Sequence, residues 1–235
     1  MVIKKFSDIE TLSQFAAEKF VKVANQAIAE RGRFLVALSG GSTPMKLYAQ
    51  LANTELDWKL VHFFWGDERC VPADDEGNSY GQAKKVLFDK IGTTNIHRVE
   101  SDLEPAVAAQ AYANTLSGFA DAPFDFPCFD LVLLGMGDDG HTASLFPGSP
   151  VEVTTPTLAV TAHYQDRPAN RVTLTQLVFN QAREVWFMVA GKSKAETLKN
   201  VLQGEHKPET YPAQRIQPVD GELVWMIDEA AGSLL

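Results

Sequence analysis

Short apolar runs alternate with segments of helical periodicity along the 235-residue chain. The apolar runs predict buried strands at residues 33–38, 61–65, 129–134, 172–174, 185–190 and 223–227. Helical spacing predicts helices between them, over residues 9–31, 44–51, 79–88, 105–119 and 192–203. Continuous apolar strands separated by helices are typical of a parallel sheet that is covered on both faces. The pattern therefore predicts a doubly wound α/β fold with a mainly parallel sheet and helices on both faces.

The first predicted helix has a signal at each end. The segment Ser7-Asp8-Ile9-Glu10 has the form of a capping box, and Gly32 is suited to the residue that follows the last turn. The next helix follows a strand and a glycine-rich turn, and we expect Pro44 at its first position.

Three loops follow predicted strands, after Leu38, Trp65 and Leu134. In open parallel sheets the carboxyl ends of the strands carry the ligand site. We therefore expect these three loops to converge on one site.

The first of these loops has the composition of a phosphate-binding turn. Gly40 and Gly41 allow backbone N–H groups to approach an anion, and Ser42 stands at the start of a helix, where the dipole favours negative charge. The pattern lacks the lysine of a P-loop NTPase. A glycine-rich turn that merely reverses the chain is the alternative explanation.

The second loop places Asp67 and Glu68 beside Arg69. These charges fit a solvated loop, but a guanidinium also suits bidentate binding of an anionic substrate. Further along, Arg171 precedes an alternating segment, and Lys194 lies at a helix start, where a positive charge opposes the dipole. Contact with a phosphate would explain this lysine, and a solvated surface charge is the alternative.

The third loop contains G-x-G-x-x-G, but its composition argues against a dinucleotide site. Asp138 and Asp139 stand where a pyrophosphate needs uncovered N–H groups. The same loop suits presentation of His141 as a general base, with Asp139 two residues away as its partner. Ser144 lacks the nucleophile-elbow motif and is expected to pack or cap.

Composition narrows the class of protein. Hydrophobic residues make up 45% and charged residues 22%, as in a globular protein, and no linker or repeat divides residues 1–235, so we expect one domain. The net charge of -9 argues against nucleic-acid or anionic-membrane partners. Two isolated cysteines, no metal-ligand spacing, no signal peptide and no long apolar segment predict a cytoplasmic protein without a metal site.

The loops together resemble one known family. The matching segments are LSGGSTP at 38–44, GDER at 66–69, NSYG at 78–81, FDLVLLGMGDDGHTASLFPG at 129–148, NRVTLT at 170–175, GKSKAETL at 191–198 and the tail from 211. They resemble the glucosamine-6-phosphate isomerase/6-phosphogluconolactonase family, and more closely its lactonase branch. The resemblance implies hydrolysis of 6-phospho-D-glucono-1,5-lactone to 6-phosphogluconate, in the oxidative pentose phosphate pathway, without a metal or organic cofactor.

The resemblance also implies roles for individual residues. His141 matches the catalytic histidine, with Asp139 orienting its ring or holding the attacking water. Phosphate recognition is implied for the loop Gly40, Gly41 and Ser42, with Arg69, Arg171 and Lys194 as candidate cations and Asp67 in support. Which cation holds phosphate and which polarises the lactone stays open, as does the choice between monomer and homodimer.

Two other functions compete with lactone hydrolysis. The isomerase/deaminase branch resembles this chain in the first and third loops, but its members carry an aromatic residue at the position of Arg69 and a glutamate at that of Phe146. A regulatory module that binds a sugar phosphate without chemistry is the second rival. The pair Asp139 and His141 argues against it, because a pure binder needs no base.

Overall fold

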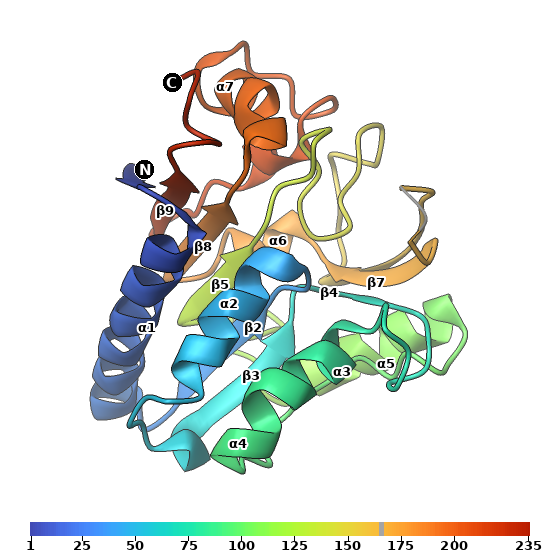
Figure 1. Cartoon of the computed structure of the whole chain (residues 1–235). Coiled ribbons are helices and arrows are strands. Elements are labelled where there is room, and N and C mark those ends of the chain that lie inside the picture. Colours follow the sequence, from blue (N-terminus) through green and yellow to red (C-terminus); the bar gives the residue numbers. More distant parts are fainter. Residues whose placement is uncertain (165–166) are drawn as a thin grey trace.

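The computed structural model describes residues 1–164 and 167–235, and it confirms the predicted α/β class (Figure 1). Six parallel strands form the central sheet in the order β1-β9-β8-β5-β2-β3. Their bounds are β1 Val2–Phe6, β2 Phe34–Leu38, β3 Val61–Trp65, β5 Leu131–Leu134, β8 Glu184–Val189 and β9 Glu222–Asp228. The strand at 2–6 was not predicted, because this edge strand mixes apolar residues with two lysines.

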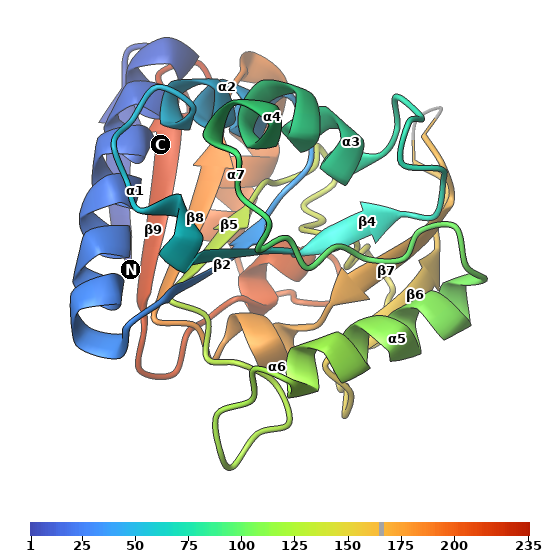
Figure 2. The ribbon, with the colours of Figure 1, turned by 90° about the horizontal axis from the view of Figure 1, so that it is seen from below.

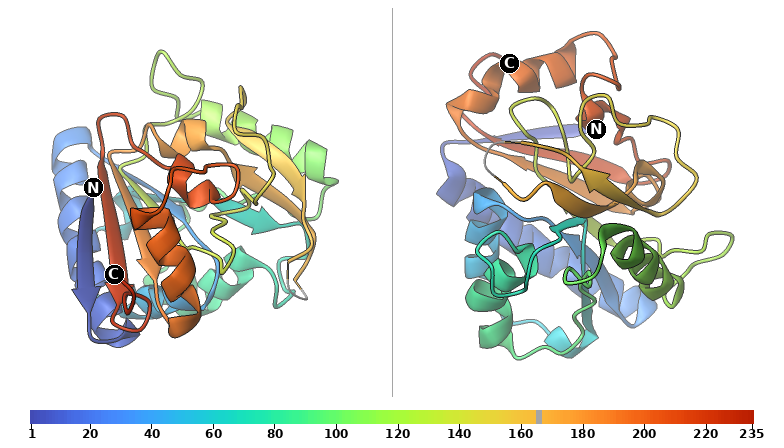
Figure 3. Two further views of the ribbon diagram at one scale, coloured as in Figure 1. Left: turned by 90° about the horizontal axis from the view of Figure 1, so that it is seen from above. Right: turned by 90° about the vertical axis from the view of Figure 1, so that its right-hand side faces the viewer.

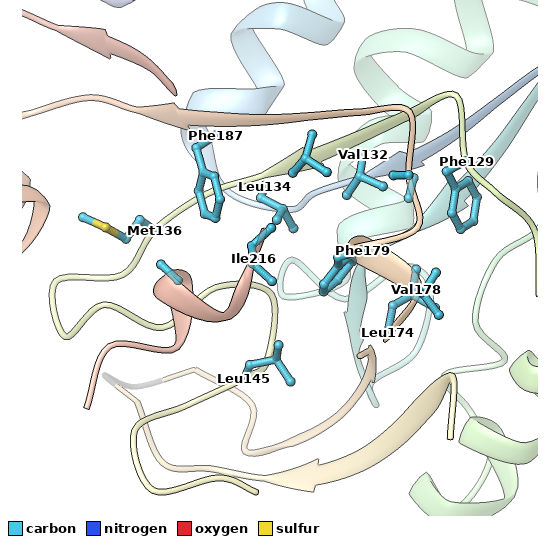
Figure 4. Close-up of a cluster of buried hydrophobic side chains, with 14 of the residues drawn as sticks. Phe129, Val132, Leu134, Met136, Leu145, Leu174, Val178, Phe179, Phe187 and Ile216 are labelled. Atoms are coloured by element: carbon cyan, nitrogen blue, oxygen red, sulfur yellow. The ribbon is translucent and has the colours of Figure 1, made fainter. Parts of the chain in front are cut away.

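Both faces of the sheet are covered, which explains why the inner strands β2 and β5 are apolar at every position and why β8 and β9 carry charged residues only at their ends. In β5, Val132 and Leu134 join one buried cluster, whereas Leu131 and Leu133 join the other. The first cluster packs against α5 (Pro105–Ser117), α6 (Gln176–Phe179) and α7 (Ala195–Gln203) (Figure 4). The second packs against α1 (Ile9–Arg31), α2 (Ser42–Leu51), α3 (Ser79–Ala83) and the π-helical segment Lys84–Phe88, which leads into α4 (Asp89–Ile91). Figure 3 shows α7 and α1 on opposite sides of the sheet.

The structure confirms the predicted end of the first helix but not its predicted capping box. Gly32 ends α1 with φ 75°. The residue that caps the start of α1 is Asp8 and not Ser7, because the Asp8 side chain accepts a hydrogen bond of 2.7 Å from the Thr11 N–H. The second helix begins at Ser42, so Pro44 is its third residue and not its first. Proline is compatible with this position because the first N–H groups of a helix have no intrahelical partner.

A second sheet of three antiparallel strands lies beside the first (Figure 2). It consists of β4 (Asp67–Arg69), β7 (Asn170–Leu174) and β6 (Thr157–Thr161) in the order β4-β7-β6, and α5 packs against it. The segment predicted as a strand at 172–174 therefore belongs to this sheet and not to the parallel one. In the ladder, Asp67 pairs with Thr173, and Arg69 pairs with Arg171.

Two histidines form a stacked pair beside the main sheet. The His62 Nδ1 lies 3.1 Å from the His97 Nε2, and the two ring planes are 9° apart. His97 also stacks on Phe64 and meets the edge of Phe119. Burial, together with the neighbouring charge of His62, lowers the pKa of His97 to about 4. Burial likewise lowers the pKa of His62.

This pair should make the fold sensitive to acid. An unfolded histidine titrates near 6.5, so between pH 6.5 and 4 the unfolded chain binds more protons than the folded one. Stability contributed by His97 is therefore complete above pH 6.5 and is lost as the pH falls to 4, by about 1–2 kcal/mol after solvent screening. As the pH is lowered from 7 to 4, the Tm of thermal unfolding should fall less for His97→Gln than for the wild type. Equal slopes would contradict this assignment, and His206→Ala, at an exposed histidine, is the control.

Candidate active site

The predicted loops converge on one cavity of about 190 Å³ at the carboxyl ends of the central strands. The cavity is lined by eight of the residues selected from the sequence, namely Gly40, Gly41, Ser42, Asp67, Arg69, His141, Arg171 and Lys194. Asp139 contacts the cavity wall through its hydrogen bonds to His141. The topological expectation for the site is thus met by the segments that follow β2, β3, β5 and β8, while Arg171 enters the cavity from the antiparallel sheet.

The His141 ring is held in place from several directions. Its Nδ1 lies 2.6 Å from the Asp139 Oδ1, which also accepts a hydrogen bond of 3.0 Å from the His141 N–H. Phe146 and Tyr164 contact the ring, each with a centroid distance of 4.5 Å. The side chain is 13% exposed, so it borders the cavity without standing in bulk solvent. With Nδ1 occupied by a carboxylate, Nε2 is the nitrogen that can accept a proton.

Two glycines in the loop make this position of the His141 ring possible. A Cβ atom at Gly137 would lie 2.1 Å from the His141 Nδ1, so any side chain there would displace the imidazole. Gly140 has φ 83°, a conformation that favours glycine.

Asp139 is suited to remain ionised beside the histidine. Burial acts to raise its pKa, but the hydrogen bond and the charge of His141 outweigh burial, so the pKa of Asp139 is lowered. A carboxylate in this state orients the ring and stabilises an imidazolium that forms during a reaction.

Two arginines face each other on the small sheet. Arg69 and Arg171 are paired directly across the β4–β7 ladder, and they are only 7% and 2% exposed. Buried like charges in this register repel each other. The Nε of Arg69 and both Nε and Nη2 of Arg171 have no hydrogen-bond partner among the described residues. Burial lowers the pKa of Arg171, nearby Asp67 opposes that change, and Arg69 adds to it.

These unused donors indicate what the cavity can bind. Buried N–H groups without partners are costly, and an anion with several acceptor oxygens would satisfy them. One donor of Arg69 is already used, since its Nη1 donates to the Gly77 carbonyl at 2.5 Å. The Arg171 guanidinium also lies over the Phe146 ring, 5.3 Å from its centroid.

The first loop and Lys194 complete the polar wall. Ser39 is clamped at both its N–H and its carbonyl by the hydroxyl of buried Tyr48, at 3.0 and 2.8 Å. Gly41 has φ 104° and precedes the first turn of α2. Lys194 forms an ion pair of 2.7 Å with Asp138, so its charge is partly compensated. The segment 192–194 forms a 3-10 turn ahead of α7.

Asp67 and Glu68 separate in the structure because successive strand residues point to opposite faces. Asp67 lines the cavity, whereas the carboxylate of Glu68 accepts three hydrogen bonds of 2.8 Å from the N–H groups of Arg69, Ser79 and Tyr80. Glu68 thereby stabilises the start of α3. Burial raises its pKa, and these hydrogen bonds oppose that shift.

The lining residues that were not selected from the sequence include Tyr164 and Arg167. Both precede β7 in a segment without apolar periodicity, so only the proximity of Arg167 to Arg171 in the chain could have drawn attention to it. Among the described residues, no cluster of three or more His, Cys, Asp or Glu side chains could hold a metal ion. Within the same residues, no helix has the length and apolarity needed to cross a membrane.

Comparison with known proteins identifies the family to which the chain belongs. Its sequence matches the family described as glucosamine-6-phosphate isomerases/6-phosphogluconolactonase over residues 7–225. The chain belongs to this family. A 6-phosphogluconolactonase of Synechocystis sp. is 43% identical to it over 214 residues, which cover 89% of this chain and 88% of that relative.

Solved structures of both branches share this fold. A 6-phosphogluconolactonase from Thermotoga maritima superposes with a TM-score of 0.86 at 29% identity, covering 97% of this chain and 99% of that one. A monomeric glucosamine-6-phosphate deaminase also gives a TM-score of 0.86, at 22% identity and with 100% of each chain covered. The fold alone therefore does not separate the branches, whereas the curated relatives at 34–43% identity over most of the chain are 6-phosphogluconolactonases, which are lactone hydrolases.

Proposed function

We propose that this member of the family hydrolyses 6-phospho-D-glucono-1,5-lactone to 6-phosphogluconate. The observation that carries the proposal is the presence, in one cavity, of a histidine oriented by a carboxylate and of buried guanidinium groups with unused donors. Similarity to proteins named 6-phosphogluconolactonase, at 34–43% identity over most of the chain in several bacteria, supports the same reaction.

The proposed chemistry uses the free nitrogen of His141. Its Nε2 removes a proton from a water molecule while the water oxygen bonds to the C1 carbonyl carbon, and the carbonyl electron pair moves to oxygen. Cationic or N–H groups in the cavity stabilise that oxyanion. When the C1 to ring-oxygen bond breaks, the imidazolium returns its proton to the ring oxygen. Asp139 keeps the imidazole oriented and stabilises its charged form during the cycle.

The phosphate end of the substrate is assigned to the first loop and the cations. Gly40, Gly41 and Ser42 offer N–H groups at the start of α2, while Arg171 and Lys194 supply positive charge. We assign the strongest contact to Arg171, since two of its nitrogens have no other partner among the described residues. The net charge of -9 does not prevent this, because its exposed charges are screened beyond about 8 Å.

One contact favours lactone hydrolysis over deamination. Phe146 packs against His141 with a centroid distance of 4.5 Å and the rings tilted by 31°, at a position where the deaminase branch is expected to carry a glutamate. Ring opening and amine release need an additional proton donor or acceptor, and a phenyl ring cannot act as one.

We place the reaction in the cytoplasm, in a monomer or homodimer. We also propose that it proceeds without metal or organic cofactor, since a base, a bound water and fixed cations supply what ester hydrolysis requires.

A paired assay tests the proposed reaction. We expect rapid acid release from freshly prepared 6-phosphogluconolactone, in excess of spontaneous hydrolysis, and no ammonia from glucosamine 6-phosphate. Ammonia release would show that the protein is a deaminase and would contradict the proposed reaction. Absence of both products, with 6-phosphogluconate still bound, would support the non-catalytic binding module instead.

A further inference from the structure

Ser144 lies on the chain three residues after His141, yet its side chain contacts Asp67 on β4. It is fully buried, at 0% exposure. Its Oγ donates a hydrogen bond of 2.7 Å to the Asp67 Oδ2, and its N–H donates one of 3.3 Å to the Thr173 Oγ1. Ser144 thus joins the histidine loop to both β4 and β7 at the position where Asp67 and Thr173 pair.

Asp67 lies where an ion pair with arginine would be expected. Asp67 and Arg69 are two residues apart on β4, so they point to the same face. Arg171 lies directly opposite Arg69 and diagonally opposite Asp67, within reach of a long side chain. All three side chains line the cavity, and all three are more than nine-tenths buried.

The expected ion pair is nevertheless absent. Within the described residues, Asp67 forms no ion pair of 4.0 Å or less with Arg69 or Arg171, and its one hydrogen-bond donor is Ser144. Three guanidinium nitrogens stay without partners meanwhile. A carboxylate free to rotate would gain charge-assisted hydrogen bonds by turning toward these groups. Some contact must therefore hold it away from them.

We propose that Ser144 is a positioning residue that restrains Asp67 and so keeps the donors of Arg69 and Arg171 available for the substrate anion. The inference rests on the proposed function, because it takes the cavity to bind a phosphorylated sugar acid. With the hydroxyl in place, Asp67 supplies charge near the arginines without occupying their donors. Without it, Asp67 pairs with a guanidinium and competes with the phosphate.

Binding of 6-phosphogluconate, measured by titration calorimetry, tests the restraint. We expect Ser144→Ala to weaken binding about tenfold, since the anion must then displace a charge-assisted pair. The decisive variant is the double one. Because an asparagine at position 67 cannot form the ion pair, Ser144→Ala combined with Asp67→Asn should bind within about threefold of Asp67→Asn alone.

Matched controls separate the restraint from a packing defect. Ser13→Ala removes the hydroxyl of another buried serine, on α1 and outside the cavity, and should leave binding unchanged. If Ser144→Ala does not fold, Ser144→Cys retains the volume with a weak donor and carries the same expectation. A purely structural role would make the double variant weaker than either single one, which would overturn the inference.

The binding and hydrolysis measurements distinguish failure of the Ser144 restraint from failure of the proposed function. If wild-type protein binds 6-phosphogluconate and Ser144→Ala binds equally well, the restraint is wrong and the proposed function stands. If the variants show the expected binding pattern but the wild type hydrolyses no lactone, the proposed function is wrong and the restraint stands. If the wild type binds neither 6-phosphogluconate nor inorganic phosphate, the cationic site on which both depend is wrong.

Discussion

His141→Ala should lower kcat for 6-phosphogluconolactone by about 10²–10⁴-fold, because removal of a positioned general base costs about that much. Binding of 6-phosphogluconate should change little, since the imidazole acts on water and not on the phosphate. The measurement is acid release at pH 7 with spontaneous hydrolysis subtracted, alongside calorimetric titration of the product.

A second substitution distinguishes the role of the His141 ring from that of Asp139. Asp139→Asn keeps the shape of the side chain but removes the charge that orients the Nδ1 proton, so we expect a smaller loss than for His141→Ala. His206→Ala, at an exposed histidine outside the cavity, should retain wild-type turnover. Turnover of His141→Ala close to that of the wild type would remove this residue from the mechanism.

The convergence of the site could be predicted from the sequence because it follows from topology. Once the apolar runs 33–38, 61–65 and 129–134 are identified as parallel strands, their carboxyl ends must meet at one edge. The chemistry of each loop then depends on nearby residues, as with Asp139 and His141, which are two positions apart. Such short-range relations are visible without coordinates.

The pairing of Arg69 with Arg171 across β4 and β7 could not be predicted in the same way. β4 consists of three charged residues and has no apolar periodicity, so nothing in the sequence marks it as a strand. Its pairing with β7 joins positions about one hundred residues apart in the sequence, a separation that no local pattern reports. The opposite directions of Asp67 and Glu68 follow from that strand alone, and the roles of both residues stayed open until it was seen.

The same applies to the contacts that set the charge balance of the cavity. The ion pair between Asp138 and Lys194 joins two loops that the sequence presents separately. In the sequence Asp138 argues against a dinucleotide site, whereas in the structure it also forms an ion pair with Lys194 and accepts a hydrogen bond from Ser193. Side chains so far apart in the sequence are brought together by tertiary packing, so this ion pair could not be predicted from the sequence.

Arg171→Met should separate phosphorylated from unphosphorylated substrates. Loss of a buried cation with unused donors should lower kcat/KM for 6-phosphogluconolactone by about 10²-fold, in line with the 2–5 kcal/mol typical of a desolvated charge contact. For gluconolactone without phosphate we expect a change of no more than about threefold.

Lys194→Met should lower kcat/KM for 6-phosphogluconolactone by less, about tenfold, because Asp138 already neutralises part of the Lys194 charge.

The stability of the ligand-free protein should move in the opposite direction. Arg171 lies directly across from Arg69, both are buried, and methionine would relieve their repulsion while filling similar space. We expect Tm to rise by about 2–4 °C, equivalent to roughly 1 kcal/mol for a chain of this size. Saturating 6-phosphogluconate should then stabilise the wild type more than the variant. Equal losses of kcat/KM for both lactones, or a lower Tm without ligand, would contradict a site that sacrifices stability to bind phosphate.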